Sequence, residues 1–328
     1  MYLLQSMKRI LLTNKYEGIP LEIVKSEVPN GFQIVFVDDL TQDALETIVP
    51  HADYILAGGR LRITKTVLEK ASKLHMIQRS GVGLDSLDLD AIKEMGIPLY
   101  VNQGVNSQSV AEHSLLLILA SLRRLTEIDS NTKLGIWDKQ GQGIKTAELA
   151  GKTVGIIGMG NTAKTLVSLL RPFSVRILYY DVSRQNEKYE HDNNMQYASI
   201  DELFKCSDII SLNCALTDST RHIINAVSIN KMKTGVVLVN TARGGVVDAN
   251  ALYDGLASGK ISFAGIDVHE TEPIPNEYAL SKLNNVILTP HIAGVTSDSF
   301  RKMMHSAFRN IDLFDKGLLE EIKQYRFI

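Results

Sequence analysis

Three side chains of the types used in alcohol and carbonyl chemistry follow three successive apolar runs in the second half of the chain. Arg243 stands in NTARGG, Glu272 in IDVHETEP and His291 in LTPHIAG. Histidine titrates near neutral pH, and a neighbouring carboxylate raises its pKa and holds the ring in place. Arginine can bind a carboxylate with two hydrogen bonds. Together they suit proton transfer to or from an acidic substrate while a hydride moves.

Each of these residues also has a structural explanation. Arg243 can cap a sheet edge, Glu272 can be solvated, and His291 can be an ordinary loop histidine. His269 is an alternative base or a pocket-lining residue, because it precedes Glu272 by three residues. Five other histidines lie in helical or polar surroundings and are interpreted as structural: His51, His75, His191, His222 and His305.

A glycine loop near the middle of the chain predicts where a dinucleotide would bind. The apolar run 154–157 is typical of a buried strand, and Gly158 and Gly160 follow it before a predicted helix over 161–170. Glycines permit a tight turn and close backbone approach, and the helix N-terminus offers N–H groups to a pyrophosphate. Ala163 occupies the place of the third glycine, a substitution the motif tolerates. An ordinary strand–helix turn is the alternative.

An acidic residue follows the next predicted strand, 176–180, about 20 residues beyond the glycines. This residue, Asp181, is placed to accept hydrogen bonds from the adenosine ribose hydroxyls. A carboxylate there repels a 2′-phosphate, so the sequence favours NAD over NADP. Arg184, three residues further on, keeps NADP use open.

Strand-like and helical runs alternate along the whole chain. In the first part the predicted strands are 8–13, 33–37, 54–57 and 76–79, with helices at 42–49 and 65–73. Between residues 150 and 290 six strands are predicted, at 154–157, 176–180, 208–213, 236–240, 263–266 and 286–288. This alternation indicates parallel βαβ units, and six strands are what a doubly wound dinucleotide domain requires.

Three further segments complete the predicted organisation. The stretch 107–125 reads as a helix that is apolar nearly all round, which suits burial between layers. The polar segment 126–149, with the lone Trp137, is either a protruding arm or a packed surface loop. An amphipathic helix over 297–316 ends the pattern.

Composition narrows the class of protein. The 328 residues have a net charge of −2, 45% hydrophobic and 22% charged residues, which is ordinary for a soluble globular protein. The charge gives no reason to expect nucleic acid or an anionic membrane as a partner. No apolar run is long enough to span a bilayer, and no secretory signal is visible. The two cysteines lack metal-type spacing, so we expect reduced thiols, no metal and a cytoplasmic location.

The motifs together resemble the D-isomer-specific 2-hydroxyacid dehydrogenase family. The resemblance rests on VGIIGMGNTA, NTARGGVVD, IDVHETEP and TPHIAG, and on the earlier RSGVGLDSLDLDAIKEMGIPLYVNQGVNSQSVAEH. It implies an α/β fold with two doubly wound parallel-sheet domains. A Rossmann NAD-binding domain, residues 107–295, would be inserted in a flavodoxin-like substrate domain, residues 1–106 and 296–328. A homodimer is implied too, with the arm around Trp137 reaching the partner.

The resemblance also implies roles for individual residues. Arg243 would bind the substrate carboxylate and carbonyl, and Glu272 would pair with His291 as the acid/base. The backbone of Val82 and Gly83 would hold the substrate carboxylate. Cofactor contacts would come from the glycine loop and from the strand ends: Gly158, Gly160, Asn161, Thr162, Asp181, Thr241, Ala242, Arg243, Asp267, His291 and Gly294.

Several positions depart from the family pattern. Ala163 replaces the third glycine, Thr162 replaces an aliphatic residue, and His269 occupies a place that is usually aromatic. Because the sequence ends at residue 328, we do not expect the C-terminal regulatory domain that some phosphoglycerate dehydrogenases carry. Glu272 is present where the family's formate dehydrogenases lack the carboxylate, which disfavours formate oxidation.

The expected reaction is NAD-dependent interconversion of a small 2-keto acid and its D-2-hydroxy acid. Arg60, Arg62 and Arg79 follow or precede glycine turns, so they can accommodate a second anionic group or be solvated and paired with acidic neighbours. Pyruvate, glyoxylate, hydroxypyruvate and phosphoglycerate-like acids all stay open. The alternative is a cofactor-sensing interaction protein that resembles the family's corepressor branch and turns over little.

Overall fold

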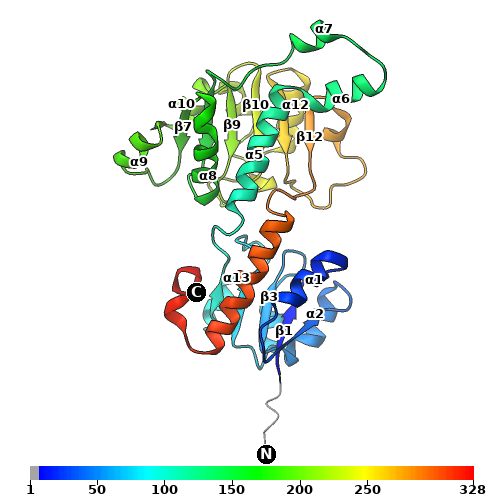
Figure 1. Ribbon diagram of the computed structural model, residues 1–328, viewed down its shortest axis with the longest axis vertical. Helices are drawn as coiled ribbons and strands as arrows, with labels where there is room; N and C mark the ends of the chain where they lie inside the picture. The colour runs from blue at the N-terminus through cyan, green and yellow to red at the C-terminus, as the bar shows by residue number, and fades with distance from the viewer. Residues whose placement is uncertain (1–6) are drawn as a thin grey trace, which may run out of the picture. The chain divides into compact units, whose positions relative to one another are not determined.

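The computed structural model describes residues 7–328, which divide into two compact units. Unit 1 consists of the described residues up to Asn106 together with Val295–Ile328, and unit 2 is Ser107–Gly294. Each unit has its own parallel sheet with helices packed on it (Figure 1). The predicted fold class, two doubly wound α/β domains, is confirmed. The residues before Met7, on which the signal-peptide expectation partly rests, lie outside the described range.

Unit 1 contains a five-stranded sheet in the order β2-β1-β3-β4-β5. All its neighbours pair in parallel, and the order is that of flavodoxin-like folds. Four strands lie where the sequence predicts them, whereas the two-residue β5 is too short to leave an apolar run. The strands are β1 Lys8–Leu12, β2 Phe32–Phe36, β3 Tyr54–Ala57, β4 Met76–Arg79 and β5 Leu99–Tyr100.

Helices cover both faces of this sheet. One core contains side chains of α1 (Gly18–Glu27) and α13 (Ser297–Asp315), including the fully buried Phe308. The other core contains side chains of α2 (Gln42–Ile48), α3 (Lys65–Lys70) and α4 (Leu89–Glu94). The final long helix therefore completes the unit in which the chain began.

Unit 2 contains a seven-stranded parallel sheet in the order β12-β11-β10-β9-β6-β7-β8. This is the Rossmann order with one added strand at the edge. The sequence predicts six strands here, and that number is wrong, because the three-residue β8 was not recognised. The strands are β6 Thr153–Ile157, β7 Arg176–Tyr180, β8 Met195–Tyr197, β9 Ile209–Leu212, β10 Val236–Asn240, β11 Ile261–Ile266 and β12 Val286–Leu288.

Two apolar cores hold the helices of unit 2 against its sheet. One face is covered by α5 (Ser107–Leu122) and α8 (Asn161–Leu170), which pack against each other and against the central strands. The other face is covered by α10 (Ile200–Cys206), α11 (Ala226–Lys231) and α12 (Ala249–Ala257). The short α9 (Glu187–Asp192) follows β7. The predicted apolar helix 107–125 is α5, and its burial explains its nearly continuous apolar surface.

The segment after α5 forms two short helices, α6 (Leu125–Lys133) and α7 (Lys139–Gly143). In Figure 1, α7 projects away from the sheet of unit 2. The apolar side chains of the segment after α5 are unusually exposed: Trp137 is 86% exposed, Ile144 85% and Leu134 78%. We call residues 125–144 the arm.

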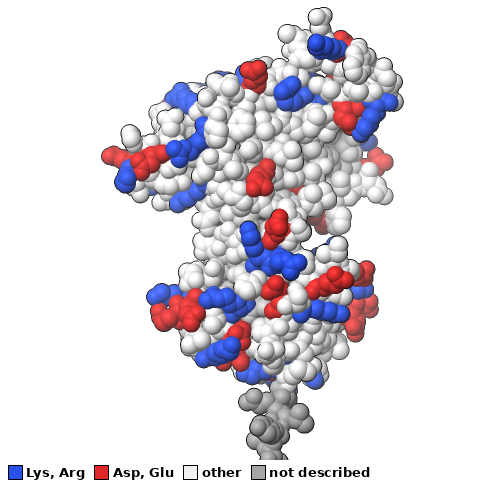
Figure 2. Space-filling view, viewed as in Figure 1, with Lys and Arg blue, Asp and Glu red and all other residues white. Residues whose placement is uncertain are grey.

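Surface and composition features agree with an ordinary globular chain. On the face shown in Figure 2, basic and acidic side chains are interspersed. Within residues 7–328 no helix is long and apolar enough to cross a membrane, and no cluster of metal-binding side chains occurs. Cys206 and Cys214 are free thiols, and burial raises the pKa of Cys214 to about 11.

Candidate active site

The residues predicted to act in chemistry or cofactor binding in unit 2 follow the carboxyl ends of its strands. Because the strands are parallel, these ends share one edge of the sheet, where ligands bind in open α/β folds. Gly158 and Gly160 follow β6, Asp181 follows β7, Thr241, Ala242 and Arg243 follow β10, Asp267 follows β11, and His291 and Gly294 follow β12.

The glycine loop has the geometry that a dinucleotide site needs. Gly158 has φ +91°, and a Cβ there would lie 2.6 Å from the backbone nitrogen of Cys214. A Cβ on Gly160, at the start of α8, would meet no atom within 4 Å. Ala163 is fully buried in the core beneath the helix, so the pattern's third glycine has a packing substitute. The space in front of the α8 N-terminus can therefore admit an anion to unpaired amide groups.

The Asp181 carboxylate lies next to the glycine loop and is hydrogen-bonded to it. Its Oδ2 accepts a hydrogen bond from the Met159 N–H at 2.6 Å, and its Oδ1 accepts one from the Ser183 N–H at 2.8 Å. These two hydrogen bonds fix the carboxylate beside the glycine loop, although Asp181 lies 22 residues after Met159 in the sequence.

Arg184, which kept NADP use open in the sequence, is bound by a carboxylate. Its Nε and Nη2 donate to the two oxygens of Glu190 at 2.9 and 2.8 Å. The guanidinium lies over the Tyr197 ring, 5.6 Å from its centre. Glu190 is buried and also accepts from the Tyr179 hydroxyl at 2.6 Å. The hydrogen bonds from Arg184, the main cause, lower the pKa of Glu190 to about 2.

Glu272 and His291 form a hydrogen-bonded pair. The His291 Nδ1 lies 2.7 Å from Glu272 Oε2, and both side chains are partly exposed. The other carboxylate oxygen of Glu272 accepts from the His269 N–H at 2.9 Å. Partial burial opposes ionisation of Glu272, but the hydrogen bonds from His291 and His269 outweigh it and lower its pKa. The imidazole therefore faces an ionised carboxylate, and its Nε2 is bonded to no described residue.

His269, the alternative base, is engaged on both sides of its ring. It is buried, with Nε2 3.1 Å from the Thr289 carbonyl oxygen and Nδ1 3.3 Å from the Tyr278 hydroxyl. A carbonyl only accepts, so Nε2 carries a proton, and in the neutral ring Nδ1 then accepts from the Tyr278 hydroxyl. The ring stands edge-on to Tyr278, with centres 5.5 Å apart. Both ring nitrogens of His269 are therefore within hydrogen-bonding distance of other residues of unit 2.

A buried carboxylate fixes the backbone around His291. Asp267 is 0% exposed, and its Oδ1 accepts from the Thr289 hydroxyl at 2.6 Å and from the Ile292 N–H at 3.0 Å. Its Oδ2 accepts from the Ala293 N–H at 2.9 Å. His291 itself adopts φ +56°, which is uncommon for a side chain with a Cβ. The Asp267 hydrogen bonds hold that turn in place.

His113 is a residue that the sequence reasoning missed. It lies on α5 with its Nε2 3.2 Å from Thr289 Oγ1 and 3.7 Å from Asp267 Oδ1. The only signal was its position at the end of SQSVAEH, a motif noted as a whole but not residue by residue.

Arg243 is half-buried on a loop that packs tightly on the Glu272 loop. A Cβ at Gly244 would lie 2.0 Å from the backbone carbon of His269, so only glycine allows this approach. Asn240 closes the turn, because its Nδ2 donates to the Arg243 carbonyl at 2.9 Å. The guanidinium Nη1 of Arg243 donates to the Ala242 carbonyl at 2.7 Å. The loops carrying the three predicted catalytic residues are thus mutually supported.

In unit 1, Val82 and Gly83 lie on the turn after β4. The Val82 side chain is 43% exposed, and no described residue accepts a hydrogen bond from either backbone N–H. Arg79 binds this turn to the one after β3, since it donates to the carbonyls of Gly83 and Ala57.

A family comparison identifies the chain. The model of the D-isomer specific 2-hydroxyacid dehydrogenase NAD binding domain matches residues 115–293, more than half of the sequence. The chain belongs to this family. It is an NAD-dependent 2-hydroxyacid dehydrogenase, an oxidoreductase, and the family resemblance seen in its sequence is confirmed.

Individual relatives of this dehydrogenase carry several names. It is 41% identical to the hydroxypyruvate reductase of Thermotoga maritima over 268 residues, 81% of this chain and 86% of that protein. It is 36% identical to the glyoxylate reductase of Thermococcus litoralis, with 94% and 90% covered. A solved D-lactate dehydrogenase from Aquifex aeolicus, complexed with NAD and lactic acid, has a TM-score of 0.83 at 31% identity, with 97% and 98% covered.

Proposed function

We propose that the dehydrogenase interconverts a small 2-keto acid and its D-2-hydroxy acid, with His291 as the acid/base, Glu272 as its partner and Arg243 as the substrate anchor. The observation that carries the proposal is the 2.7 Å contact between Glu272 and His291 Nδ1, which leaves Nε2 for the substrate oxygen.

NAD supplies hydride acceptance in one direction and, as NADH, hydride donation in the other. In reduction, His291 donates its Nε2 proton to the carbonyl oxygen as that oxygen gains negative charge. Glu272 stabilises the imidazolium before the transfer and orients the ring throughout. Arg243 binds the substrate carboxylate and stabilises charge on the reacting oxygen. In oxidation His291 takes the hydroxyl proton at the same atom.

The chain's own groups fit a dinucleotide. The Gly160 side of the loop is open, the α8 amides point into that space, and Asp181 is fixed next to it. We propose that the cofactor is held by the residues at this edge: Gly158, Gly160, Asn161, Thr162, Asp181, Thr241, Ala242, Arg243, Asp267, His291 and Gly294. Unit 2 would be the NAD-binding domain and unit 1 the substrate domain.

The substrate we propose has a single carboxylate and no second strong anion. The unpartnered amides of Val82 and Gly83 suit that carboxylate. Arg79 is occupied by carbonyl groups of its own unit, while Arg60 and Arg62 are exposed. This favours glyoxylate, hydroxypyruvate or pyruvate over a phosphorylated acid.

The decisive experiment is NADH consumption with a panel of glyoxylate, hydroxypyruvate, pyruvate and phosphohydroxypyruvate. We expect turnover with at least one of the three unphosphorylated acids. Tight NADH binding without turnover of any acid would instead support the corepressor-like alternative. Turnover of the phosphorylated acid alone would refute the proposed substrate class.

We also propose that the arm joins two copies of the chain. Trp137 and Ile144 are the most exposed of its apolar side chains, a pattern typical of an interface. Replacing both with serine should convert a particle of twice 36.3 kDa into one of 36.3 kDa, as measured by light scattering. Val227→Ser, which removes another exposed apolar side chain of unit 2, should leave the mass unchanged. A parent chain that is already monomeric would refute the dimer.

The preference for NADH over NADPH gives a further prediction. Arg184 follows Asp181 by three residues in the sequence, and Glu190 binds its guanidinium. In Glu190→Gln the guanidinium loses its ionic partner and is free to meet a 2′-phosphate. We expect the ratio of kcat/KM for NADH over NADPH to fall about fivefold, a modest change because the arginine is exposed to solvent. Adding Arg184→Gln should restore the parent ratio. An unchanged ratio in Glu190→Gln would mean that Asp181 alone decides the preference.

The same pair predicts a pH dependence of stability. The Glu190 pKa is lowered to about 2 in the folded chain, so its contribution is complete above its ordinary pKa of 4.5 and is lost as the pH falls toward 2. Thermal unfolding should therefore separate parent and Glu190→Gln at pH 7, and the difference should shrink between pH 4 and pH 3.

A further inference from the structure

The turn after β4 in unit 1, residues 80–83, carries a run of free backbone N–H groups. No described residue accepts a hydrogen bond from the N–H of Gly81, Val82 or Gly83. A Cβ at Gly81 would meet no atom within 4 Å, so the space beside the turn is open. Successive N–H groups in a turn form a concave site for an anion. They bind an anion only where the turn is held with these groups facing outward.

One buried residue, Asn102, holds this turn from inside the fold. Asn102 lies two residues after β5 and is 1% exposed. Its Nδ2 donates to the Ser80 carbonyl at 2.8 Å, and its backbone N–H donates to the Gly81 carbonyl at 3.1 Å. The carbonyls of the first two residues of the turn are therefore both bound by Asn102.

These two hydrogen bonds orient the N–H groups that follow. In a planar trans peptide, a carbonyl and the next N–H point in opposite directions, and both peptide bonds here are trans. Because the Ser80 carbonyl points to the Asn102 side chain, the Gly81 N–H points away from it. Because the Gly81 carbonyl points to the Asn102 backbone, the Val82 N–H also points away. Asn102 thus orients two of the three free N–H groups.

A buried amide network fixes the Asn102 side chain. Its Nδ2 also donates to the Met303 carbonyl in α13 at 2.9 Å, and its Oδ1 lies 3.4 Å from Gln78 Nε2. The Gln78 Oε1 accepts from Asn310 Nδ2, also in α13, at 3.1 Å. Gln78 and Asn310 are both 0% exposed. The Asn102 Nδ2 therefore has one acceptor in the turn and one in the last long helix.

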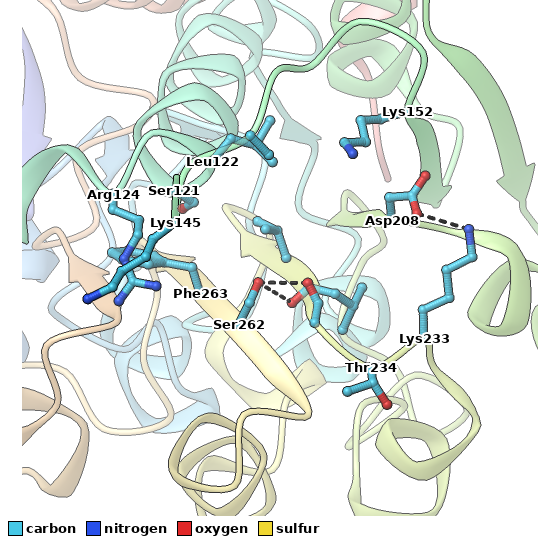
Figure 3. Close-up of a pocket in the computed structure, with 14 residues that line it drawn as sticks. Ser121, Leu122, Arg124, Lys145, Lys152, Asp208, Lys233, Thr234, Ser262 and Phe263 are labelled. Carbon is cyan, nitrogen blue, oxygen red and sulfur yellow. Dashed lines mark hydrogen bonds and ion pairs between the residues drawn. The ribbon is translucent and has the colours of Figure 1, made fainter. Parts of the chain in front are cut away.

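Unit 2 also has a polar cavity, of about 270 Å³, where β6, β9, β10 and β11 begin (Figure 3). Lys233 donates to Asp208 there at 2.9 Å, and Lys145 and Lys152 lie on opposite sides. These side chains pair with each other or lie apart. The N–H groups after β4 are instead successive and oriented by one residue, which is the arrangement that binding of an anion requires.

We propose that Asn102 is a positioning residue, which holds the N–H groups of the turn after β4 toward the substrate carboxylate. This proposal rests on the proposed function, in which Val82 and Gly83 bind that carboxylate. Asn102 is buried behind the turn and does not itself touch the substrate. Its loss should weaken acid binding equally in the ground state and the transition state, and so raise KM with little change in kcat.

The test is a graded series at position 102 in the full chain. Asn102→Asp keeps the shape of the side chain but has at most one proton to donate, and Asn102→Leu has none. We expect KM for the acid that turns over fastest to rise about threefold in Asn102→Asp and at least tenfold in Asn102→Leu. The kcat should change less than twofold. NADH affinity, measured by fluorescence titration, should stay at the parent value, because the proposed cofactor residues belong to unit 2.

Asn310→Leu is the matched control, because Asn310 is equally buried in the same network but does not contact the turn. Both leucine variants should lower the melting temperature, whereas Asn310→Leu should keep KM within twofold of the parent. An unchanged KM in Asn102→Leu, or an equal rise in both leucine variants, would overturn the proposal. Should Asn102→Leu fail to fold, the KM of Asn102→Asp decides in the same way.

Calorimetric titration with oxamate, an unreactive mimic of a 2-keto acid, in the presence of NADH separates this proposal from the proposed reaction. We expect oxamate affinity to fall in the order parent, Asn102→Asp, Asn102→Leu. That order in a chain that reduces no acid would refute the proposed reaction and support the role of Asn102. Equal oxamate affinity in the parent and Asn102→Leu would overturn the role of Asn102, and a parent that neither binds oxamate nor reduces an acid would overturn both.

Discussion

His291→Gln is expected to lower kcat by about 10³-fold, the middle of the range for losing a general acid/base. Glutamine keeps a polar side chain of similar reach but cannot exchange a proton near neutral pH. NADH affinity should change little, because the Asp267 hydrogen bonds that shape the turn come from backbone groups and Thr289 and are retained. Steady-state kinetics and NADH fluorescence titration measure the two quantities separately.

The matched control for this variant is His269→Gln. His269 is buried and bonded to the Thr289 carbonyl and Tyr278, so its loss should lower the melting temperature more than it lowers kcat. The reverse outcome, with full activity in His291→Gln and none in His269→Gln, would reassign the acid/base. Glu272→Gln should retain some turnover but move the alkaline limb of the pH–rate profile for NADH consumption to lower pH, since the proton-donating imidazolium loses its stabilising charge.

The second large effect is expected for Gly158→Ala. The new methyl group would lie 2.6 Å from the Cys214 nitrogen and 2.7 Å from the Asn213 carbonyl carbon, both of them backbone atoms. The φ of +91° adds conformational strain for any residue with a Cβ. Together these effects should destabilise unit 2 by about 3 kcal/mol. Scanning calorimetry should show a Tm lowered by roughly 8 °C, and NADH binding should be lost as the loop shifts.

Gly160→Ala tests the same loop without that clash. Its methyl group meets no atom within 4 Å and its φ of −77° is ordinary for alanine. The Tm should stay the same or rise slightly, whereas NADH should bind about tenfold more weakly because the methyl group occupies the approach to the α8 amides. Unchanged NADH affinity in Gly160→Ala would move the cofactor away from this loop.

The sequence predicted long, strongly patterned elements well and short ones poorly. Helix α8 begins and ends at the predicted residues, because a glycine turn and an amphipathic run mark both ends. Strands β5 and β8 have two and three residues, too few to show a period. Their places are decided by pairing with β4 and β7, which is information from distant parts of the chain.

In the candidate site, too, some residues could be predicted from the sequence pattern, whereas contacts between distant residues could not. The order Arg243, Glu272, His291 was visible because each follows an apolar run, and parallel strands bring their ends to one edge. His269 could not be judged from sequence, since its engagement depends on Thr289 and Tyr278 meeting its two ring nitrogens. His113 was overlooked because it is far from the strand ends in sequence and reaches Asp267 only through the packing of α5.

The interlocked loops of unit 2 have a consequence for evolvability. Gly244 touches the His269 backbone, Glu272 holds His291, and Asp267 holds the turn that follows, so a change in one loop disturbs the other two. The turn at Val82 and Gly83 is held through the Gly83 carbonyl by Arg79, but its Val82 side chain is exposed and takes no part in the contacts among the unit 2 loops. Selection for a new substrate should therefore accumulate changes in the small unit 1 turn while the loops of unit 2 that carry the proposed catalytic residues stay fixed. Directed evolution should begin there.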